Sequence, residues 1–246
     1  MSEWFKDWFA SEDYLNVYSH RNKKDADSLL KLILSNISIP QNASILDSAC
    51  GNGRHSESLA SLGYNVFAFD LSKTLLQIAQ KNKLNNNSNV KYFCSDIRNI
   101  PLNKSFDVVL NLFTSFGYFK SDKENFAIVN FASKSLKKGG YFIFDYLNPI
   151  YVENNLVEYS EKISDKKKII EKRKIQSGRV EKEIEIIDDK FKHRYFESVQ
   201  LYSNQEILTM FENFGFHPLK NFGNFNGDVY NENRSERMII VFEKKD

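Results

Sequence analysis

The stretch ILDSACGNGRHS, residues 45–56, decides the fold. Its first half is short and apolar, which is typical of a buried strand, and it runs directly into a tight Gly-x-Gly turn and a helical pattern. Gly51 and Gly53 can adopt positive φ and let a ligand approach the backbone closely. The helix that follows begins with unpaired amides, which favour a carboxylate or a phosphate. The stretch therefore predicts a strand–turn–helix unit that binds a nucleotide.

Acidic side chains accompany this turn at the ends of successive strands. Asp47 precedes the turn and Asp96 closes a later strand. Asp70 follows the turn by roughly 20 residues, where an acid can hold a ribose diol. Ser56 stands where a dinucleotide-binding fingerprint has its third glycine. Three strand-end acids without a phosphate-binding lysine indicate a positively charged nucleoside, and S-adenosylmethionine has that chemistry.

The surrounding sequence alternates short apolar runs with amphipathic stretches. Buried strands are predicted over residues 44–49, 65–70, 90–96, 106–113 and 141–147, because these runs are β-branched or aromatic and apolar almost throughout. Helices are predicted over residues 54–61, 72–84 and 122–136, the last ending at a Gly-Gly pair. Such alternation predicts an α/β fold with a doubly wound, mostly parallel sheet.

Two segments break the alternation. The N-terminal segment shows helical patterns over residues 3–19 and 23–37, and residues 166–202 alternate apolar with charged side chains over three stretches, as an antiparallel meander does. Beyond the meander, Ser203 and Glu206 form a possible capping box for a helix over residues 204–213, before two strands at 217–222 and 237–243. We therefore divide the chain into residues 1–40 (helical lid), 41–150 (nucleotide-binding core), 151–202 (antiparallel insertion) and 203–246 (completion of the core sheet).

Composition restricts the class of protein. The 246 residues are 41% hydrophobic, enough for one α/β domain with a small insertion. The 34 basic and 32 acidic side chains leave a net charge of +2, which gives no electrostatic case for nucleic acid or a membrane surface as partner. Cys50 and Cys94 do not suggest a disulfide framework. We expect a cytoplasmic protein with no signal peptide, membrane helix or metal site.

Together these landmarks resemble the class I S-adenosylmethionine-dependent methyltransferases, whose first motif reads D-x-G/A-x-G-x-G. In this sequence the motif is Asp47, Ala49, Gly51 and Gly53, with alanine in the first glycine slot. The resemblance continues through FAFDLS, CSDI, FDVVLNLFTSFGYF and LKKGGYFIFDYLN, and covers residues 44–243 apart from the meander. It implies a Rossmann-like, seven-stranded sheet, with the meander as an insertion and the N-terminal helices as a lid.

The resemblance also implies which residues bind the cofactor. Asp70 is expected to bind the ribose hydroxyls and Asp96 the adenine amine, although either acid can instead cap the turn that follows it. Adenine is expected between Leu71 and Ile97, and the methionine moiety beside the backbone of residues 49–53. The full expected set is Asp47, Ala49, Gly51, Gly53, Arg54, Asp70, Leu71, Asp96, Ile97, Asn111 and Leu112, with Tyr18 and Arg21 closing over the cofactor from the lid.

Aromatic and polar residues at the predicted carboxyl ends of the strands are candidates for the acceptor side. Methyl transfer from a sulfonium is a direct displacement, which needs alignment and exclusion of water more than acid–base catalysis. The substrate candidates are Phe113, Phe116, Tyr118, Asn148, Arg194 and Arg237, and the candidate catalytic residues are Tyr118, Tyr146 and His193. Core packing is the alternative role for the aromatic residues, and contact with solvent is the alternative for the arginines.

The sequence thus predicts transfer of a methyl group from S-adenosylmethionine to a small molecule, by a monomer or a homodimer. Asn111 is not followed by Pro-Pro-Tyr, the signature of nucleic-acid amino methyltransferases. Two alternatives stay open: a protein or RNA methyltransferase that docks through the meander, and a non-catalytic S-adenosylmethionine-binding partner subunit. A nicotinamide oxidoreductase is disfavoured by Ser56 and Asp47.

Overall fold

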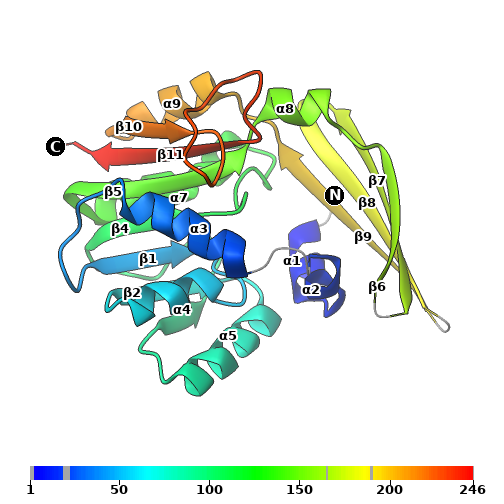
Figure 1. The fold of residues 1–246 in the computed structure, drawn as a ribbon, viewed down its shortest axis with the longest axis horizontal. Coiled ribbons are helices and arrows are strands. Elements are labelled where there is room, and N and C mark those ends of the chain that lie inside the picture. Colours follow the sequence, from blue (N-terminus) through cyan, green and yellow to red (C-terminus); the bar gives the residue numbers. More distant parts are fainter. Residues whose placement is uncertain (1–2, 19–22, 165, 189–190, 246) are drawn as a thin grey trace.

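The structure is a computed structural model that describes residues 3–18, 23–164, 166–188 and 191–245. Its main sheet has seven strands: β1 Ser44–Ser48, β2 Asn65–Asp70, β3 Lys91–Cys94, β4 Phe106–Asn111, β5 Leu136–Leu147, β10 Phe216–Phe222 and β11 Arg237–Lys244. They lie in the order β10-β11-β5-β4-β1-β2-β3 (Figure 1). β1 to β5 pair in parallel, whereas β11 pairs antiparallel with both β5 and β10. The predicted doubly wound, mostly parallel sheet is confirmed.

Helices cover both faces of this sheet. The helices of the main unit are α3 Lys23–Leu34, α4 Arg54–Ser61, α5 Lys73–Asn86, α6 Asp122–Asn125, α7 Ala127–Ser135 and α9 Asn204–Glu212. α3 and α4 bury apolar side chains on one face, and α7 and α9 do so on the other. The central strands β1 and β4 are therefore buried almost along their whole length, which explains their nearly continuous apolar sequence.

A second, antiparallel sheet stands beside the carboxyl edge of the main sheet (Figure 1). Its strands are β6 Tyr159–Ser164, β7 Lys167–Gln176, β8 Arg179–Ile187 and β9 Lys192–Gln200, and α8 Pro149–Asn154 connects it to β5. α1 Trp4–Ala10 and α2 Asp13–Val17 lie between the two sheets. Trp8 and Val17 pack there against isoleucines of the second sheet. None of the described helices is long and apolar enough to cross a membrane.

Several elements differ in extent from the sequence prediction. The meander has a fourth strand, β6, and the predicted helix over residues 3–19 is two short helices. β5 begins at Leu136 and runs through the glycine pair, which was predicted to end a helix. A Cβ at Gly140 would lie 3.0 Å from the carbonyl oxygen of Asp107, so glycine is needed there for close approach to β4. The capping box of Ser203 and Glu206 is present as predicted.

Candidate active site

The glycine turn joins β1 to α4 through a run of left-handed backbone. Ala49, Gly51 and Gly53 have φ values of 53°, 58° and 80°. The Asp70 carboxylate at the end of β2 accepts hydrogen bonds from the amide of Gly51 (2.8 Å) and from the amide of Ser72 (2.8 Å). Burial raises the pKa of Asp70 above its usual value. Asp70 therefore holds the turn in place as well as facing the space beside it.

Asp47, near the end of β1, is held by Ser56, the serine that stands in place of the third glycine. The Ser56 hydroxyl donates to Asp47 Oδ2 at 2.5 Å, and both side chains are buried. Burial, with a contribution from the neighbouring Asp70, raises the pKa of Asp47 to about 6 even though the Ser56 hydrogen bond lowers it. Ser56 thus supplies a hydrogen bond that glycine would lack, and this is a physical reason for the departure from the dinucleotide fingerprint.

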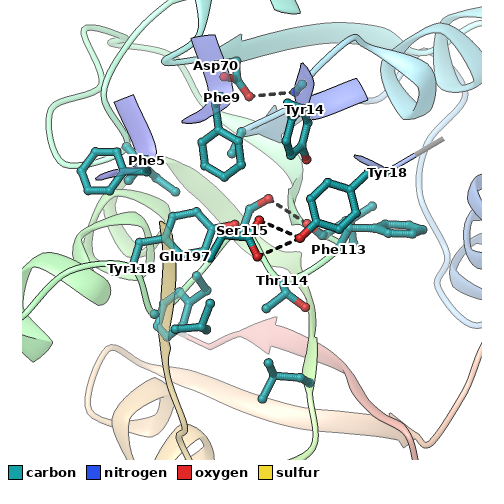
Figure 2. Close-up of a pocket in the computed structure, with 18 of the residues that line it drawn as sticks. Phe5, Phe9, Tyr14, Tyr18, Asp70, Phe113, Thr114, Ser115, Tyr118 and Glu197 are labelled. Carbon is teal, nitrogen blue, oxygen red and sulfur yellow. Dashed lines mark hydrogen bonds between the residues drawn. The ribbon is translucent and has the colours of Figure 1, made fainter. Parts of the chain in front are cut away.

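A cavity of about 710 Å³ opens beside these carboxylates. The carboxyl ends of β1, β2 and β4 form one wall, and α1, α2 and the inner face of the second sheet form the others. Figure 2 shows Asp70 at one end of this space and Thr114, Ser115, Tyr18 and Glu197 further along it. The predicted residues that line the cavity are Tyr18, Asp47, Ala49, Gly51, Arg54, Asp70, Leu71, Asp96, Ile97, Leu112, Phe113, Phe116, Tyr118 and Arg237.

Other predicted residues lie behind the cavity wall. Asn111 is buried and donates to Ser48 Oγ (3.1 Å) and to the carbonyl of Ser115 (3.2 Å). Tyr146 is fully buried and donates to the carbonyl of Gln200. Asn148 is also fully buried and donates to the carbonyls of Glu232 and Ser235, at 2.7 Å each. Gly53 packs against Tyr92 and Ala79. In this structure these residues support the wall rather than face the cavity.

The two candidates on β9 also lie outside the cavity lining. His193 Nδ1 is 3.0 Å from Asp13 Oδ2, and Arg194 Nε is 2.9 Å from Glu185 Oε1. The structure thus pairs His193 with α2 and Arg194 with the neighbouring strand β8, where each has an acidic partner. Arg21 lies outside the described residues.

Asp96 lines the cavity, but its carboxylate already has a cationic partner. Arg98 donates to Asp96 Oδ1 through its amide (2.9 Å) and Nε (3.0 Å), and to Oδ2 through Nη2 (2.7 Å). Partial burial alone would raise the pKa of Asp96, yet the hydrogen bonds from Arg98 lower it. Arg98 also bonds Glu3 and Glu124, so it joins the N-terminal segment to the main unit.

The structure adds cavity residues that the sequence analysis missed. Arg173, Lys182 and Glu197 are directly paired across β7, β8 and β9 and line the cavity. Lys182 Nζ lies 2.8 Å from Glu197 Oε2. Tyr18 donates to both oxygens of Glu197 (2.6 and 2.8 Å), and Trp8 Nε1 donates to Oε1 at 2.6 Å. In the sequence, side chains of the meander alternate between its two faces. These three residues could be predicted to line a cavity only once it was known which face points inward.

Three observations test whether this wall suits a cationic nucleoside. Asp47 and Asp70 are buried side by side, and each has a raised pKa, so a cation nearby would stabilise their ionised forms. A Cβ built on Gly51 meets no atom within 4 Å, so the backbone there faces open space. His55, whose pKa burial lowers to about 3, is neutral, and its Nε2 has no hydrogen-bond partner among the described residues. The wall fits such a ligand.

Known proteins resemble this chain over the region that holds the site. The sequence of residues 45–140 matches the methyltransferase domain family. This region of the chain resembles a methyltransferase domain. The domain includes the glycine turn, Asp47, Asp70 and Asp96, and ends in β5.

The similar proteins are of two kinds: curated relatives in sequence and solved structures with the same fold. The chain is 29% identical over 133 residues to a putative methyltransferase, YqeM, of Bacillus subtilis, which is 52% of this chain and 53% of the relative. It spans about half the length of the curated relatives it matches. A crystal structure of an S-adenosylmethionine-dependent methyltransferase from Clostridium acetobutylicum shares the fold with a TM-score of 0.80 at 21% identity, over 95% of this chain and 96% of that one.

A further structure has S-adenosylmethionine bound: CalS10, an amino pentose methyltransferase from Micromonospora echinaspora. Its TM-score is 0.67 at 20% identity, over 96% of this chain and 98% of that one. The matched methyltransferase domain and the shared fold agree with the predicted resemblance to the class I S-adenosylmethionine-dependent methyltransferases.

Proposed function

We propose that this chain transfers a methyl group from S-adenosylmethionine to a small-molecule acceptor by direct displacement. One observation carries the proposal: the two buried carboxylates of Asp47 and Asp70 flank an uncovered, left-handed Gly51 at one end of a cavity with aromatic walls. Negative charge and an exposed backbone suit a cationic nucleoside, and the other end of the same cavity offers room for an acceptor.

The expected cofactor residues keep their roles in this proposal. Asp70 would bind the ribose hydroxyls, with Leu71 and Ile97 on either side of the adenine. Asp47 and the backbone of residues 49–53 would lie beside the methionine moiety. The role of Asp96 toward the adenine amine requires that its carboxylate accept one more hydrogen bond beyond those from Arg98, and an ionised carboxylate has about four lone-pair sites for this.

When bound, S-adenosylmethionine supplies an electrophilic methyl group on a positively charged sulfur. The chain's own residues contribute orientation and a dry environment, which such a displacement needs. Four aromatic residues of the N-terminal segment line the cavity: Trp4, Phe5, Phe9 and Tyr14. Their rings pack edge to face on one another and on Tyr118, so they exclude water from the space between the sheets.

Two further observations favour a small acceptor over a macromolecule. The cavity lies between the two sheets and is covered by α1 and α2, whereas a nucleic acid or protein acceptor needs an open groove. The net charge of +2 gives little attraction for RNA. CalS10, which has the same fold, is an amino pentose methyltransferase. We keep the four-part division of the chain, with residues 151–202 on the acceptor side, as part of the proposal.

The experiment that tests the proposal is calorimetry with S-adenosylhomocysteine, the product of the donor. We expect Asp70→Ala and the milder Asp70→Asn to weaken binding at least tenfold, because a hydrogen bond to a charged group contributes about 1.5–3 kcal/mol. Asp27→Ala is the matched control, since Asp27 is exposed on α3 and bonds only Ser58 among the described residues. Wild-type affinity in both Asp70 variants contradicts the proposal. A screen for S-adenosylhomocysteine release across metabolite pools then identifies the acceptor.

A further inference from the structure

The turn that follows β4 is held in an unfavourable backbone conformation. Phe113 and Thr114 have φ values of 54° and 63°, so two consecutive residues other than glycine are left-handed. A side chain at such φ is strained, and for a β-branched residue such as threonine the strain is largest. Strain of this kind persists only where the surrounding structure enforces it, and it is concentrated at functional sites.

A buried acid–arginine pair enforces this conformation. Asp145 in β5 is fully buried, and its Oδ2 accepts the amide of Phe113 at 2.8 Å. Its carbonyl oxygen accepts the amide of Thr114 at 3.0 Å. Arg237 at the start of β11 donates through Nε to Asp145 Oδ1 (2.5 Å) and through Nη2 to Thr114 Oγ1 (2.9 Å). We call Asp145 and Arg237 the clamp, because together they bind two successive amides and one side chain of the turn.

The clamp fixes side chains in both halves of the cavity. The Phe113 ring lies 4.2 Å from the Arg54 guanidinium and 5.1 Å from the His55 ring, so it covers the start of α4 beside the glycine turn. Thr114 and Ser115 face the space shared with Tyr18 and Glu197 (Figure 2). The donor half and the acceptor half of the cavity therefore share this one turn as a wall.

The hydrogen bonds of the turn also determine which of its two hydroxyl groups can donate to a ligand and which can accept. Arg237 can only donate, so Thr114 Oγ1 accepts and its own hydrogen is directed elsewhere. Ser115 Oγ donates to the carbonyl of Leu112 at 3.0 Å, which leaves its lone pairs available. Within the described part of the chain neither hydroxyl makes another bond. The turn thus presents one hydrogen-bond donor and one acceptor to the cavity, a pair that matches a neutral hydroxyl group on the methyl acceptor.

We propose that Asp145 and Arg237 are positioning residues that hold the Phe113–Ser115 turn in its left-handed conformation, and that this turn orients a hydroxyl-bearing acceptor beside the cofactor. The inference rests on the proposed function. Its mechanism is specific: the clamp is needed because neither Phe113 nor Thr114 is glycine, and the strain is largest at the β-branched Thr114. Removing the clamp should therefore matter less when glycine occupies that position.

A double-mutant cycle read by S-adenosylhomocysteine calorimetry tests this mechanism. Asp145→Asn is expected to weaken binding at least tenfold, because the relaxed turn withdraws Phe113 from the start of α4. In a Thr114→Gly background the same substitution is expected to weaken binding no more than threefold, since glycine adopts this φ without strain. Equal losses in both backgrounds, or no loss in either, overturn the inference.

Asp107→Asn is the matched control for loss of a structural acid. Asp107 lies at the start of β4, at the other end of the strand from the Phe113–Ser115 turn. Its carboxylate accepts a hydrogen bond from the amide of Ser44 (2.8 Å) and pairs with Lys137 (2.7 Å). It is expected to lower the melting temperature without changing S-adenosylhomocysteine affinity. If the wild-type chain itself fails to bind S-adenosylhomocysteine, the proposed function fails and the inference with it. If wild type binds but the cycle shows no coupling, only the inference fails.

A second arm of the experiment addresses the acceptor side. Thr114→Val keeps the shape of the side chain and removes its hydroxyl, and Thr114→Ser restores the hydroxyl. With any acceptor found by the release screen, Thr114→Val is expected to lower kcat/KM at least tenfold and to weaken S-adenosylhomocysteine binding no more than threefold, because Asp145 still holds both amides of the turn. Thr114→Ser is expected to recover kcat/KM. An acceptor that carries no hydroxyl group before methylation, or wild-type turnover by Thr114→Val, overturns the acceptor assignment.

Discussion

Alanine substitutions at two glycines of one turn should separate cofactor binding from folding. Gly51 and Gly53 both have positive φ, so alanine is strained at either position. Their surroundings differ, however. An added Cβ at Gly51 meets no atom within 4 Å and stands in the cavity, whereas at Gly53 it would lie 2.9 Å from Tyr92 Cζ and 3.1 Å from Ala79 Cβ.

The expected magnitudes follow from these distances. Alanine at a left-handed position strains the folded backbone, but it also lowers the conformational entropy of the unfolded chain, which offsets part of that cost. The net loss in free energy of unfolding is about 1 kcal/mol, or about 2–4 °C in melting temperature for a chain of this size. Gly53→Ala adds overpacking of about 1–3 kcal/mol, because Tyr92 must move and loses its 2.9 Å hydrogen bond to Glu57. We therefore expect a melting temperature lower by roughly 6–12 °C for Gly53→Ala and by roughly 2–4 °C for Gly51→Ala.

Cofactor binding should respond in the opposite order, and Gly51→Ala should weaken it more than Gly53→Ala does. A methyl group at position 51 occupies space that the donor is proposed to use, so Gly51→Ala should weaken S-adenosylhomocysteine binding at least tenfold, equivalent to about 1.4 kcal/mol. Gly63→Ala is the control: its φ is +90°, a Cβ there also meets no atom within 4 Å, and it does not line the cavity. Differential scanning calorimetry and titration calorimetry supply the two readouts. Equal affinity of the Gly51 and Gly63 variants would refute the reasoning.

Two further predictions concern buried charge. The pKa of Asp47 is raised to about 6 in the folded chain from an ordinary 3.8, so its ionisation destabilises the native state as pH rises from about 4 to 7. Asn cannot ionise at this position. Between pH 4 and pH 7 the free energy of unfolding of Asp47→Asn should therefore rise by up to about 3 kcal/mol relative to wild type, as measured by denaturant titration. A pH-independent difference contradicts this. Glu197→Gln should speed amide hydrogen exchange in residues 4–17 about tenfold or more, because charged hydrogen bonds of about 1.5–3 kcal/mol hold Trp8 and Tyr18 there. Glu185→Gln, which breaks only exposed ion pairs on the same sheet, should leave that exchange unchanged.

The sequence was sufficient to predict the main sheet because local signals and long-range packing agree there. Apolar strands, the Gly51–Gly53 turn and the capping box at Ser203 each indicate an element without knowledge of its neighbours. The extent of β5 could not be predicted in the same way. Its glycines look like a helix stop, and only the close approach of β4 to Gly140 explains why the strand continues through them.

The proposed acceptor side of the site was less accessible to sequence reasoning for a similar reason. Side chains on the meander alternate between two faces, and which face is inner depends on packing against α1 and α2. Glu197 therefore could not be distinguished from Arg194 before the structure was known. Asp145 did carry a signal, since an acid inside an apolar strand covered on both faces needs a buried partner, and Arg237 is that partner.

The cavity is assembled from segments that are far apart along the chain. The N-terminal segment around Trp8 rests on Glu197 of β9, and the turn at Thr114 rests on Arg237 of β11, the last of the described strands. During synthesis the parallel strands can pair as they emerge, but α1 and α2 have no second sheet to rest on until residues near 200 follow. Their aromatic side chains stay uncovered for that interval. A ribosome-bound chain that stops short of β9 should therefore have the parallel strands β1 to β5 of its main sheet and an uncovered N-terminal segment that binds chaperones.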